Sequence, residues 1–350
     1  MSLVDDVRRE LEAVGADALL VSAPANVRYL SGFTSPEDGV VVVTAERAVL
    51  MTDGRYTAQT NEESLLEVII TPSWEERLPD VVGDRSLAVE SEHLSLQRFR
   101  RLSRRLGREP IATDGLLAPL RLVKTAQEIG LLEEAARVTD EALAQVLPML
   151  RPGVREIEVA LELDRTMRLA GSDGSGFHII VASGVRSAMP HGVASNKVIE
   201  AGDLVTIDFG AVYQGYHADM TRALAVGPIV PELRRLFDAV LEAQQASLAA
   251  VAPGKTGREL DAIAREVLAG HGLGEAFSHS LGHGTGLEIH EGPRLSTRSD
   301  DVLAPGMTVT IEPGVYLPGF GGVRIEDLAV VTETGHRVLS KSPKAFQQVG

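Results

Sequence analysis

Residues 202–210 read GDLVTIDFG, and residues 306–314 read GMTVTIEPG. Five of the nine aligned positions are identical, and Asp208 falls against Glu312. Val-Thr-Ile favours a buried strand in both segments, and each strand ends on an acidic residue. The match indicates an internal repeat in which two strands each carry one acid.

Other pairs of segments keep nearly the same spacing. RPGVREIE at 151–158 resembles APGKTGRELD at 252–261, and Phe177-His178 lies about 100 residues before Phe277-Ser278-His279. Chance similarity of Pro-Gly turns and Val-rich strands is the alternative. Because several pairs share one offset, we expect an α+β domain made of two helix-then-hairpin halves related by a pseudo-two-fold axis.

The pattern before Thr125 is different. Short apolar runs bounded by Gly, Pro, Asp or Ser alternate with helical segments, which predicts a smaller α/β domain over 1–122. Residues 107–121 are interpreted as its linker. The larger domain, 123–350, begins with a long helix that stops at Pro152-Gly153. The expected strands of the first domain are 18–22, 40–44, 48–52, 68–70 and 86–90, with helices at 2–14 and 94–107.

Composition excludes several classes of function. The 350 residues include 34 Lys plus Arg and 49 Asp plus Glu, a net charge of −15, and 4% are aromatic, so nucleic-acid binding is not expected. No cysteine is present, which excludes disulfides and thiolate metal sites. No apolar run approaches the roughly 20 residues of a membrane span, and the charged N-terminus does not resemble a secretory signal. A cytoplasmic protein without a membrane partner is therefore expected.

The hairpin over 205–222 is the first candidate site. With its turn centred between Tyr213 and Gln214, Asp208 and Asp219 would face each other across the two strands. Directly opposed carboxylates are destabilising unless they share a proton or a cation. The alternative is an exposed hairpin with two solvated aspartates.

The second half offers further acids. The repeat places Glu312 at the position equivalent to Asp208, and a pseudo-two-fold axis would bring both to one centre. In RIED at 324–327, Arg324 and Glu326 are two residues apart and share a strand face. Asp327 would point the other way, solvated or structural. The alternative for Glu326 is a surface salt bridge with Arg324, which would contribute little.

Histidines gather near these acids in the sequence. Three lie in HSLGHGTGLEIHE, a segment whose glycines and lack of HExxH exclude a zinc-peptidase helix. A lone histidine is more often structural than a ligand, but three around a glycine-rich turn beside several buried acids favour a site. The candidates are His191, His217, His279, His283 and His290.

These residues, in this order, resemble the pita-bread metallopeptidases, a family that includes Xaa-Pro dipeptidases (prolidases), Xaa-Pro aminopeptidases and methionine aminopeptidases. The resemblance covers the whole chain, because Xaa-Pro enzymes carry an N-terminal domain like 1–122. One departure is Thr285, where an aliphatic residue is commoner. The five family metal ligands match Asp208, Asp219, His283, Glu312 and Glu326.

The resemblance also implies a role for each residue. Asp208 would hold one metal ion, Asp219 and Glu326 would bridge two, and His283 and Glu312 would complete the second site. Glu312 would also be the general base. The other roles would be oxyanion stabilisation by His191 and His290, contact with proline or its carboxylate by His279, and anchoring of a ligating carboxylate by Arg324.

The implied function is metal-dependent hydrolysis of the bond between an N-terminal residue and proline. The N-terminal domain argues against a methionine aminopeptidase, and the compact length favours a prolidase over an Xaa-Pro aminopeptidase acting on longer peptides. The cofactors would be two divalent ions per subunit, Mn²⁺ first and Co²⁺ or Zn²⁺ as alternatives. Small proline-containing peptides are the expected partners, and a homodimer is the expected assembly. A non-catalytic binding protein is a remote alternative, because this chain keeps all five ligands.

Overall fold

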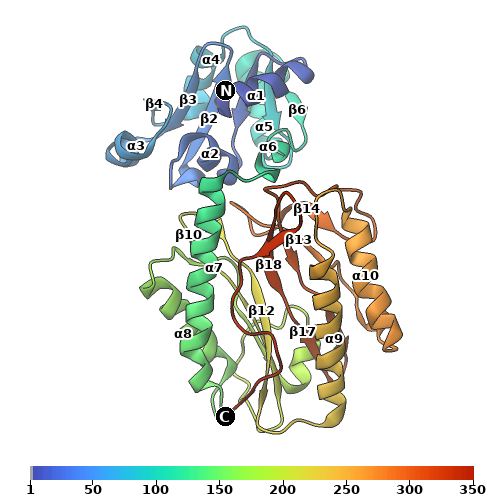
Figure 1. Cartoon of the computed structure of the whole chain (residues 1–350). Coiled ribbons are helices and arrows are strands. Elements are labelled where there is room, and N and C mark those ends of the chain that lie inside the picture. The colour runs from blue at the N-terminus through green and yellow to red at the C-terminus, as the bar shows by residue number, and fades with distance from the viewer. Residues whose placement is uncertain (1–2) are drawn as a thin grey trace. The chain divides into compact units, whose positions relative to one another are not determined.

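The structure is a computed structural model that describes residues 3–350 (Figure 1). The chain folds as two compact units, Met1–Arg121 and Leu122–Gly350. Short 3₁₀ helices connect several elements: η1 Pro36–Asp38, η2 Gly54–Tyr56, η3 Leu147–Met149, η4 Gly184–Ala188 and η5 Gly274–Ala276.

A six-stranded sheet in the order β4-β3-β2-β1-β5-β6 forms the centre of the first unit. β2 is buried along its whole length, since one of its faces packs on α1 and α2 and the other on α4 and α5. Its valine run therefore does not alternate with polar residues. The strands are β1 Ala18–Val21, β2 Gly39–Thr44, β3 Ala48–Thr52, β4 Glu67–Ile70, β5 Leu87–Glu90 and β6 Ile111–Thr113. The helices are α1 Leu3–Ala13, α2 Pro24–Ser31, α3 Thr57–Glu63, α4 Trp74–Val82, α5 Leu96–Leu106 and α6 Ala118–Leu122.

The prediction of a linker over 107–121 is wrong. Ile111–Thr113 form β6, which pairs in parallel with β5, and the segment continues through buried Leu117 into α6. A three-residue edge strand with one large apolar side chain carries too little periodicity to be recognised from sequence. The segment thus completes the sheet of the first unit.

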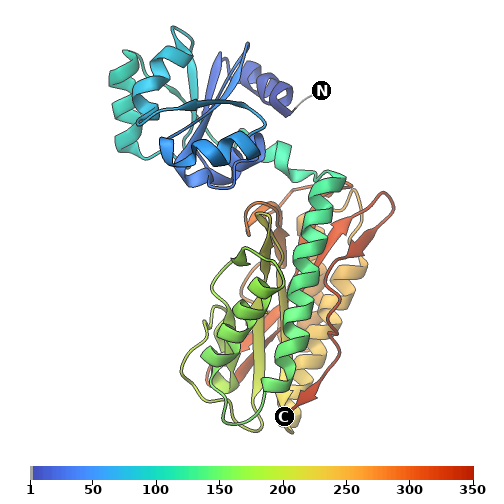
Figure 2. The same cartoon turned by 90° about the vertical axis from the view of Figure 1, so that its left-hand side faces the viewer.

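The second unit contains two pairs of long helices. α7 packs on α8 and α9 packs on α10, and the two views place these pairs on opposite flanks of the strands between them (Figures 1 and 2). Each of α7 and α10 begins with a threonine capping box, Thr125 with Glu128 and Thr256 with Glu259. The helices are α7 Ala126–Val146, α8 Glu156–Leu169, α9 Pro231–Ala249 and α10 Gly257–Gly270.

The strands of this unit form several small sheets. The two main ones have the orders β20-β12-β9-β8 and β15-β18-β19, one for each half of the repeat. Their strands are β8 Ile180–Ser183, β9 Leu204–Phe209, β12 Met220–Val226, β20 Gln348–Val349, β15 Thr308–Ile311, β18 Asp327–Val331 and β19 His336–Val338. The shorter strands are β7 Gly174–Ser175, β10 Ala211–Tyr213, β11 Tyr216–His217, β13 Gly282–Gly284, β14 Glu291–Leu295, β16 Gly314–Leu317 and β17 Gly321–Arg324.

Hydrogen bonding repeats in the two halves. Arg155 forms an isolated β-bridge with Val198 just before α8, and Thr256 forms one with Val302 just before α10. The Pro-Gly turns that precede these residues hydrogen-bond to the same two segments. Chance similarity does not reproduce long-range pairing, so the α+β fold with an internal repeat is confirmed.

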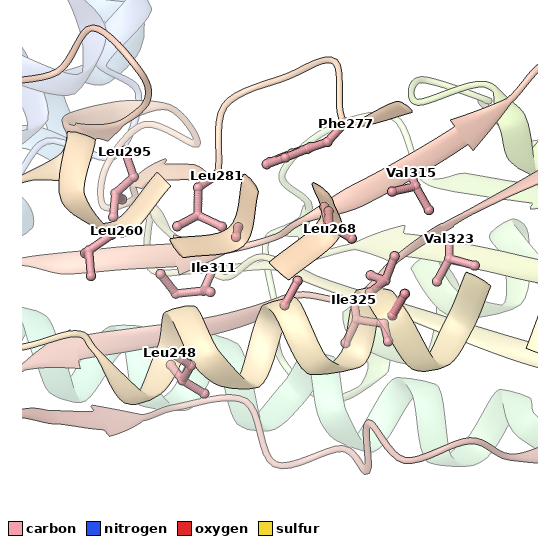
Figure 3. Close-up of a cluster of buried hydrophobic side chains, with 14 of the residues drawn as sticks. Leu248, Leu260, Leu268, Phe277, Leu281, Leu295, Ile311, Val315, Val323 and Ile325 are labelled. Atoms are coloured by element: carbon pink, nitrogen blue, oxygen red, sulfur yellow. The ribbon is translucent and has the colours of Figure 1, made fainter. Parts of the chain in front are cut away.

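The hydrophobic core orients the acidic residues. In the second half, Leu260 and Leu268 of α10 belong to one buried cluster with Ile311 and Ile325 (Figure 3). Burying a side chain of this size contributes about 1.5–3 kcal/mol. Because successive side chains of an extended segment point to opposite faces, the next residues, Glu312 and Glu326, are directed away from this core.

Candidate metal centre and active site

A cavity of about 630 Å³ lies in the second unit, and all the residues predicted for the site except His217 line it. They come from strand ends and loops of both halves, as the repeat requires. The predicted residues are His191, Asp208, Asp219, His279, His283, His290, Glu312, Arg324 and Glu326. The others on the wall are Phe177, His178, Ile180, Pro190, Val193, Ser280, Ile289 and Arg294.

Three donors form the centre of this site. One ligand atom from each of Asp219, His283 and Glu326 lies within 4.8 Å of the other two, and all three side chains are buried. His283 Nε2 is 3.7 Å from Asp219 Oδ2 and 3.3 Å from Glu312 Oε1. Carboxylates from both halves therefore surround a single imidazole.

The orientation of His283 is set by the backbone. Its Nδ1 lies 3.1 Å from the Gly284 carbonyl oxygen, which only accepts, so Nδ1 carries the proton and donates it. Nε2 then faces the carboxylates of Asp219 and Glu312. Negative oxygens and a ring nitrogen meeting in this way require a positive charge between them: either a proton on Nε2, which then donates to Glu312, or a metal ion bound by the Nε2 lone pair.

Two carboxylate oxygens of the site are left without a partner. Oδ1 of Asp208 and Oε1 of Glu326 are buried and have no hydrogen-bond partner among the described residues. A buried unpaired carboxylate oxygen costs several kcal/mol of desolvation free energy if nothing replaces water. Both atoms are available as ligands.

The carboxyl groups differ in proton affinity. Burial, and then the negative charges of Glu326 and Asp208, raise the pKa of Asp219 well above its usual value. Burial and the charge of Glu312 do the same for the pKa of Glu326, and burial raises the pKa of Asp208 less because Arg324 opposes it. Burial would also raise the pKa of Glu312, but its hydrogen bond with His283 holds that pKa below the usual value. Without cations, three of the four acids therefore bind a proton more tightly than an ordinary carboxyl group does.

The predicted pairing of Asp208 with Asp219 is wrong by two residues. β9 and β12 pair Asp208 with Thr221, because the turn is centred on Gln214-Gly215, both of which have positive φ (47° and 80°). This is the two-residue hairpin geometry that favours glycine. A shift of two residues keeps the same strand face, so Asp208 and Asp219 still lie on one side, as diagonal neighbours.

Thr221, which was not identified from the sequence, has a central position in the site. Its hydroxyl donates to Glu326 Oε2 at 2.7 Å and accepts from Arg324 Nε at 3.1 Å. With the correct hairpin register, its place opposite Asp208 would have indicated it.

Arg324 connects several parts of the site. Nη2 donates to Asp208 Oδ2 at 2.5 Å, and Nη1 donates to the Pro190 carbonyl at 3.0 Å and to Tyr316 Oη at 2.7 Å. Burial alone would lower the pKa of Arg324, but its contacts with Tyr316 and Asp208 keep that pKa well above the usual value, so Arg324 stays a cation. The sequence alternative, a surface salt bridge between Arg324 and Glu326, is contradicted, since both are buried and Arg324 pairs with Asp208.

His279 is also held in one tautomer. Nδ1 donates to the Ser280 carbonyl at 2.8 Å, and Nε2 lies 3.0 Å from Tyr316 Oη, which donates to it while accepting from Arg324. Burial lowers the pKa of His279, so the ring is neutral. Tyr316 is the second site residue that was not identified from the sequence. No periodic pattern indicates it, because its role depends on contact between two distant segments.

The three other candidate histidines, His191, His217 and His290, have different positions. The His290 ring packs edge-on against His283 with centroids 4.4 Å apart, and burial followed by the nearby His283 lowers the pKa of His290. His191 lines the cavity beside Pro190. His217 lies outside the wall, where Nδ1 donates to the Gly286 carbonyl at 3.1 Å and supports the glycine-rich segment.

Asp327 faces the other side of the strand, as predicted, but it is not solvated. Its carboxylate pairs with Arg222 Nη2 at 2.7 Å and Lys344 Nζ at 2.5 Å and accepts from Gln244 Nε2 at 3.0 Å. Arg222 also donates to the Glu326 carbonyl oxygen. The structural alternative is therefore correct, and Asp327 fixes the backbone behind the site.

The residues present fit divalent cations. Four carboxylates and one imidazole line this cavity, and two of the carboxylate oxygens have no partner among the described residues, which gives an oxygen-rich donor set typical of Mn²⁺, Co²⁺ or Zn²⁺. Within residues 3–350, no helix is long and apolar enough to cross a membrane.

Known sequence families match both units. The sequence model of metallopeptidase family M24 matches residues 130–333, and that of the creatinase/prolidase N-terminal domain matches residues 4–123. The chain belongs to metallopeptidase family M24. It is therefore a metal-dependent hydrolase, and the family membership inferred from sequence is confirmed.

Individual members of the family are similar over nearly the whole chain. The Xaa-Pro dipeptidase of Pyrococcus furiosus is 40% identical over 330 residues, 94% of each chain. The solved structure of the Xaa-Pro dipeptidase from Bacillus anthracis is 44% identical, with a TM-score of 0.96 over 99% of each chain. That of the X-Pro aminopeptidase from Thermotoga maritima is 40% identical, with a TM-score of 0.91 over 97% of this chain and 100% of the other.

Proposed function

We propose that this chain is an Xaa-Pro dipeptidase, which hydrolyses the bond between an N-terminal residue and a C-terminal proline. The observation that carries the proposal is the buried cluster of Asp219, His283 and Glu326 on the wall of a cavity large enough for a dipeptide. The M24 relatives named Xaa-Pro dipeptidase support the choice of substrate.

The donor set suits two divalent ions per chain, with Mn²⁺ as the first candidate and Co²⁺ or Zn²⁺ as alternatives. Asp208 would hold one ion, Asp219 and Glu326 would serve both, and His283 and Glu312 would hold the second. When bound, the ions supply Lewis-acid polarisation of the carbonyl and lower the pKa of the attacking water.

The protein's own groups position the substrate and move protons. Glu312 is the proposed general base, and its lowered pKa keeps it ionised and able to accept a proton from water. His191 and His290 would donate to the scissile carbonyl oxygen, where negative charge develops. Neutral His279 would contact the proline side, and Arg324 would hold Asp208 in place.

Selectivity for proline follows from chemistry that needs no amide hydrogen. The X–Pro bond has no N–H, so a site that relies on binding that donor cannot use it. A site that acts on the carbonyl oxygen and binds the substrate in a cavity is not affected by the missing donor.

Arg294 supports a dipeptidase over an aminopeptidase. Its exposed side chain lines the same cavity as His290, where a guanidinium can bind a free C-terminal carboxylate in a bidentate manner. A longer peptide has an uncharged amide at that position. The Thermotoga maritima relative, named an X-Pro aminopeptidase, makes the comparison of substrates necessary.

The experiment compares cleavage of Ala-Pro with cleavage of Ala-Pro-Ala by the metal-loaded protein. We expect Ala-Pro to be strongly preferred, and Arg294→Gln to reduce that preference by raising KM for Ala-Pro. Equal or better cleavage of Ala-Pro-Ala would replace the dipeptidase by an aminopeptidase. Absence of cleavage of either peptide would contradict Xaa-Pro activity altogether.

Three further parts of the proposal concern organisation. We propose functional domains at 1–122 and 123–350, a homodimer, and a cytoplasmic location. Sedimentation velocity tests the dimer, and fractionation of cells tests the location.

A further inference from the structure

Two wholly buried acids in the second unit lie outside the cavity wall and have arginine partners. Glu156 begins α8, and Asp261 lies in the second turn of α10; neither residue has any exposed surface. Burial of a carboxylate is unfavourable unless it is paired and hydrogen-bonded, and a paired buried acid adds little stability compared with apolar packing. A gain in stability therefore does not explain why these two acids are buried and paired.

Asp261 and Arg265 hold the segment that carries His279. The two side chains pair at 2.6 Å, from Arg265 Nε to Asp261 Oδ2. Arg265 Nη2 then donates to the carbonyl oxygen of His279 itself at 2.7 Å, and Nη1 donates to that of Phe277 at 3.1 Å. Asp261 Oδ1 accepts from Leu281 N at 3.1 Å.

These contacts fix both sides of the histidine. The Phe277 ring lies under the Arg265 guanidinium, 4.5 Å from its carbon to the ring centroid, and meets the His279 ring edge-on at 5.0 Å. On the other side, the Leu281 carbonyl accepts from Glu312 N at 2.9 Å. One acid–arginine pair thus reaches His279 directly and Glu312 through one residue.

Glu156 and Arg186 make the corresponding contacts around His191. Glu156 accepts from Ser183 N at 2.8 Å and Ser195 Oγ at 2.7 Å, at the two ends of the segment that contains His191. Arg186 pairs with the same carboxylate and donates through Nη2 to the Val193 carbonyl at 2.9 Å. One buried acid and its arginine partner thus connect the two ends of the segment.

Duplication of the fold alone does not explain the two pairs. When Pro152-Gly153 is aligned with Pro253-Gly254, Glu156 falls against Gly257 and Asp261 falls against Ala160. Each half thus has its acid at a place where the other half has none, yet both acids hold a segment with a cavity histidine. The two pairs share one feature: each hydrogen-bonds to the backbone of the segment that carries a cavity histidine.

We propose that the pairs Asp261–Arg265 and Glu156–Arg186, each of a buried acid with a partly exposed arginine, are positioning residues for His279 and His191, respectively. Each pair holds the irregular backbone of its segment in one conformation, so that the imidazole meets the substrate in the geometry that catalysis requires. The proposal rests on the function proposed above for the effect on catalysis, but the positioning itself is independent of substrate.

A double-mutant cycle tests the first pair. kcat/KM for Ala-Pro is measured for the wild type, Arg265→Ala, His279→Ala and the double variant. We expect Arg265→Ala to lower kcat/KM roughly 10- to 10²-fold, the size of effect that misplacing a group produces, and to have less than a twofold effect, roughly, when His279 is already absent. An equal loss in both backgrounds, or no loss in the wild-type background, would overturn the proposal.

Arg258→Ala is the matched control. Arg258 also lies on α10 and pairs with Asp300 at 2.6 Å, but both side chains are exposed. Its kcat/KM is expected to be that of the wild type. If Arg265→Ala does not fold, Arg265→Lys keeps a cation beside Asp261 but cannot reach both carbonyls, so it should show the same loss and the same dependence on His279.

A readout without substrate separates this proposal from the proposed function. In protein labelled with ¹⁵N-histidine, the His279 ring signal is assigned by its loss in His279→Ala. Arg265→Ala should shift this signal and speed hydrogen exchange at Nδ1, and Arg258→Ala should not. An unchanged His279 signal in Arg265→Ala would overturn the positioning role even if the enzyme cleaves no Xaa-Pro peptide.

The same cycle with Arg186→Ala and His191→Ala tests the other half. Arg165→Ala is its control, because Arg165 lies on α8 in an exposed pair with Glu162. We expect the loss from Arg186→Ala, or from Arg186→Lys if the first variant does not fold, to depend on His191 and not on His279. A loss that depends on neither histidine would overturn the role of this pair.

Discussion

Glu326 and Asp327 are consecutive residues, both almost wholly buried, and their surroundings are opposite. Asp327 is neutralised by the protein itself, since Arg222 and Lys344 pair with it and Gln244 donates to it. Glu326 receives one hydrogen bond, from Thr221, and its other oxygen has no partner among the described residues. The backbone at the start of β18 thus separates a completed charge network from an incomplete one.

The difference lies in how the negative charge of a buried carboxylate is neutralised on each side of the backbone. On the side of Asp327, two cations from distant parts of the chain meet one acid. On the side of the cavity, Arg324 pairs with Asp208, and burial together with neighbouring acids raises the pKa values of Asp219 and Glu326. Positive charge from outside the chain is what the cavity side needs, and divalent cations supply it.

The largest effect is expected from a substitution on the cavity side, at Glu326. Glu326→Gln removes a charge and a ligand while keeping the shape, so we expect kcat/KM for Ala-Pro to fall by at least about 10³-fold, more than the loss of a single oxyanion donor. Steady-state kinetics on the metal-loaded variant measures this. Glu333→Gln, the same change at an exposed position after β18, should retain wild-type activity. Near-normal activity of Glu326→Gln would remove Glu326 from the site.

The matching change on the other side should affect stability first. Asp327→Asn leaves Arg222 and Lys344 without their buried anion, and breaking such a pair destabilises a protein by about 3–5 kcal/mol. Urea unfolding measures the free energy, and metal analysis of the folded variant should still find the wild-type metal content. Loss of metal with unchanged stability would mean that the two sides do not differ as described.

A third substitution tests whether a cavity histidine stabilises the negative charge that develops during the reaction. His290 lies on the cavity wall with an exposed side chain, its ring against that of His283, and is the proposed donor to the developing oxyanion. His290→Ala should lower kcat by roughly 10²–10³-fold, with metal content unchanged. If kcat stays at the wild-type value, His290 has no part in the reaction.

The smallest effect is a dependence of stability on pH in chelated protein. The pKa values of Asp208, Asp219 and Glu326 are raised in the fold, so these groups stabilise the metal-free protein below the ordinary carboxyl range, near 4, and lose this as pH rises through the raised values. Glu312, with a lowered pKa, acts in the opposite direction but alone. Each tenfold difference in proton affinity corresponds to about 1.4 kcal/mol.

Thermal unfolding of metal-free and metal-loaded protein measures this dependence. The stabilisation produced by metal should grow as pH rises from about 5 to 8, because protons compete with the ions for the same oxygens. A metal effect that is constant over this range would contradict the shared carboxylate cluster.

Much of the site could be predicted because the repeat and the strand alternation are both local patterns. Ile311 and Ile325 belong to the core, so the next residue in each case had to face the cavity. The details that were missed or mistaken depend on three-dimensional contacts. The hairpin register depends on a turn at Gln214-Gly215, and the neutralisation of Asp327 depends on Lys344, 17 residues further along the chain.

The fold shows the same division. The valine run of β2 and the capping boxes of α7 and α10 are evident in sequence, and those elements form. β6 is a three-residue edge strand, stabilised by pairing with β5 and not by any pattern of its own, so it was interpreted as a linker. Tyr316 and Thr221 are found only when the cavity is assembled from both halves.

Titration calorimetry of the chelated protein with Mn²⁺ tests the central claim most directly. Two ions should bind per chain in the wild type, with release of protons that increases as pH falls, and Asp219→Ala should abolish binding of the pair while circular dichroism remains that of the folded protein. Failure of the wild type to bind any divalent ion, or unchanged binding by Asp219→Ala, would contradict the assignment of this cluster as the metal centre.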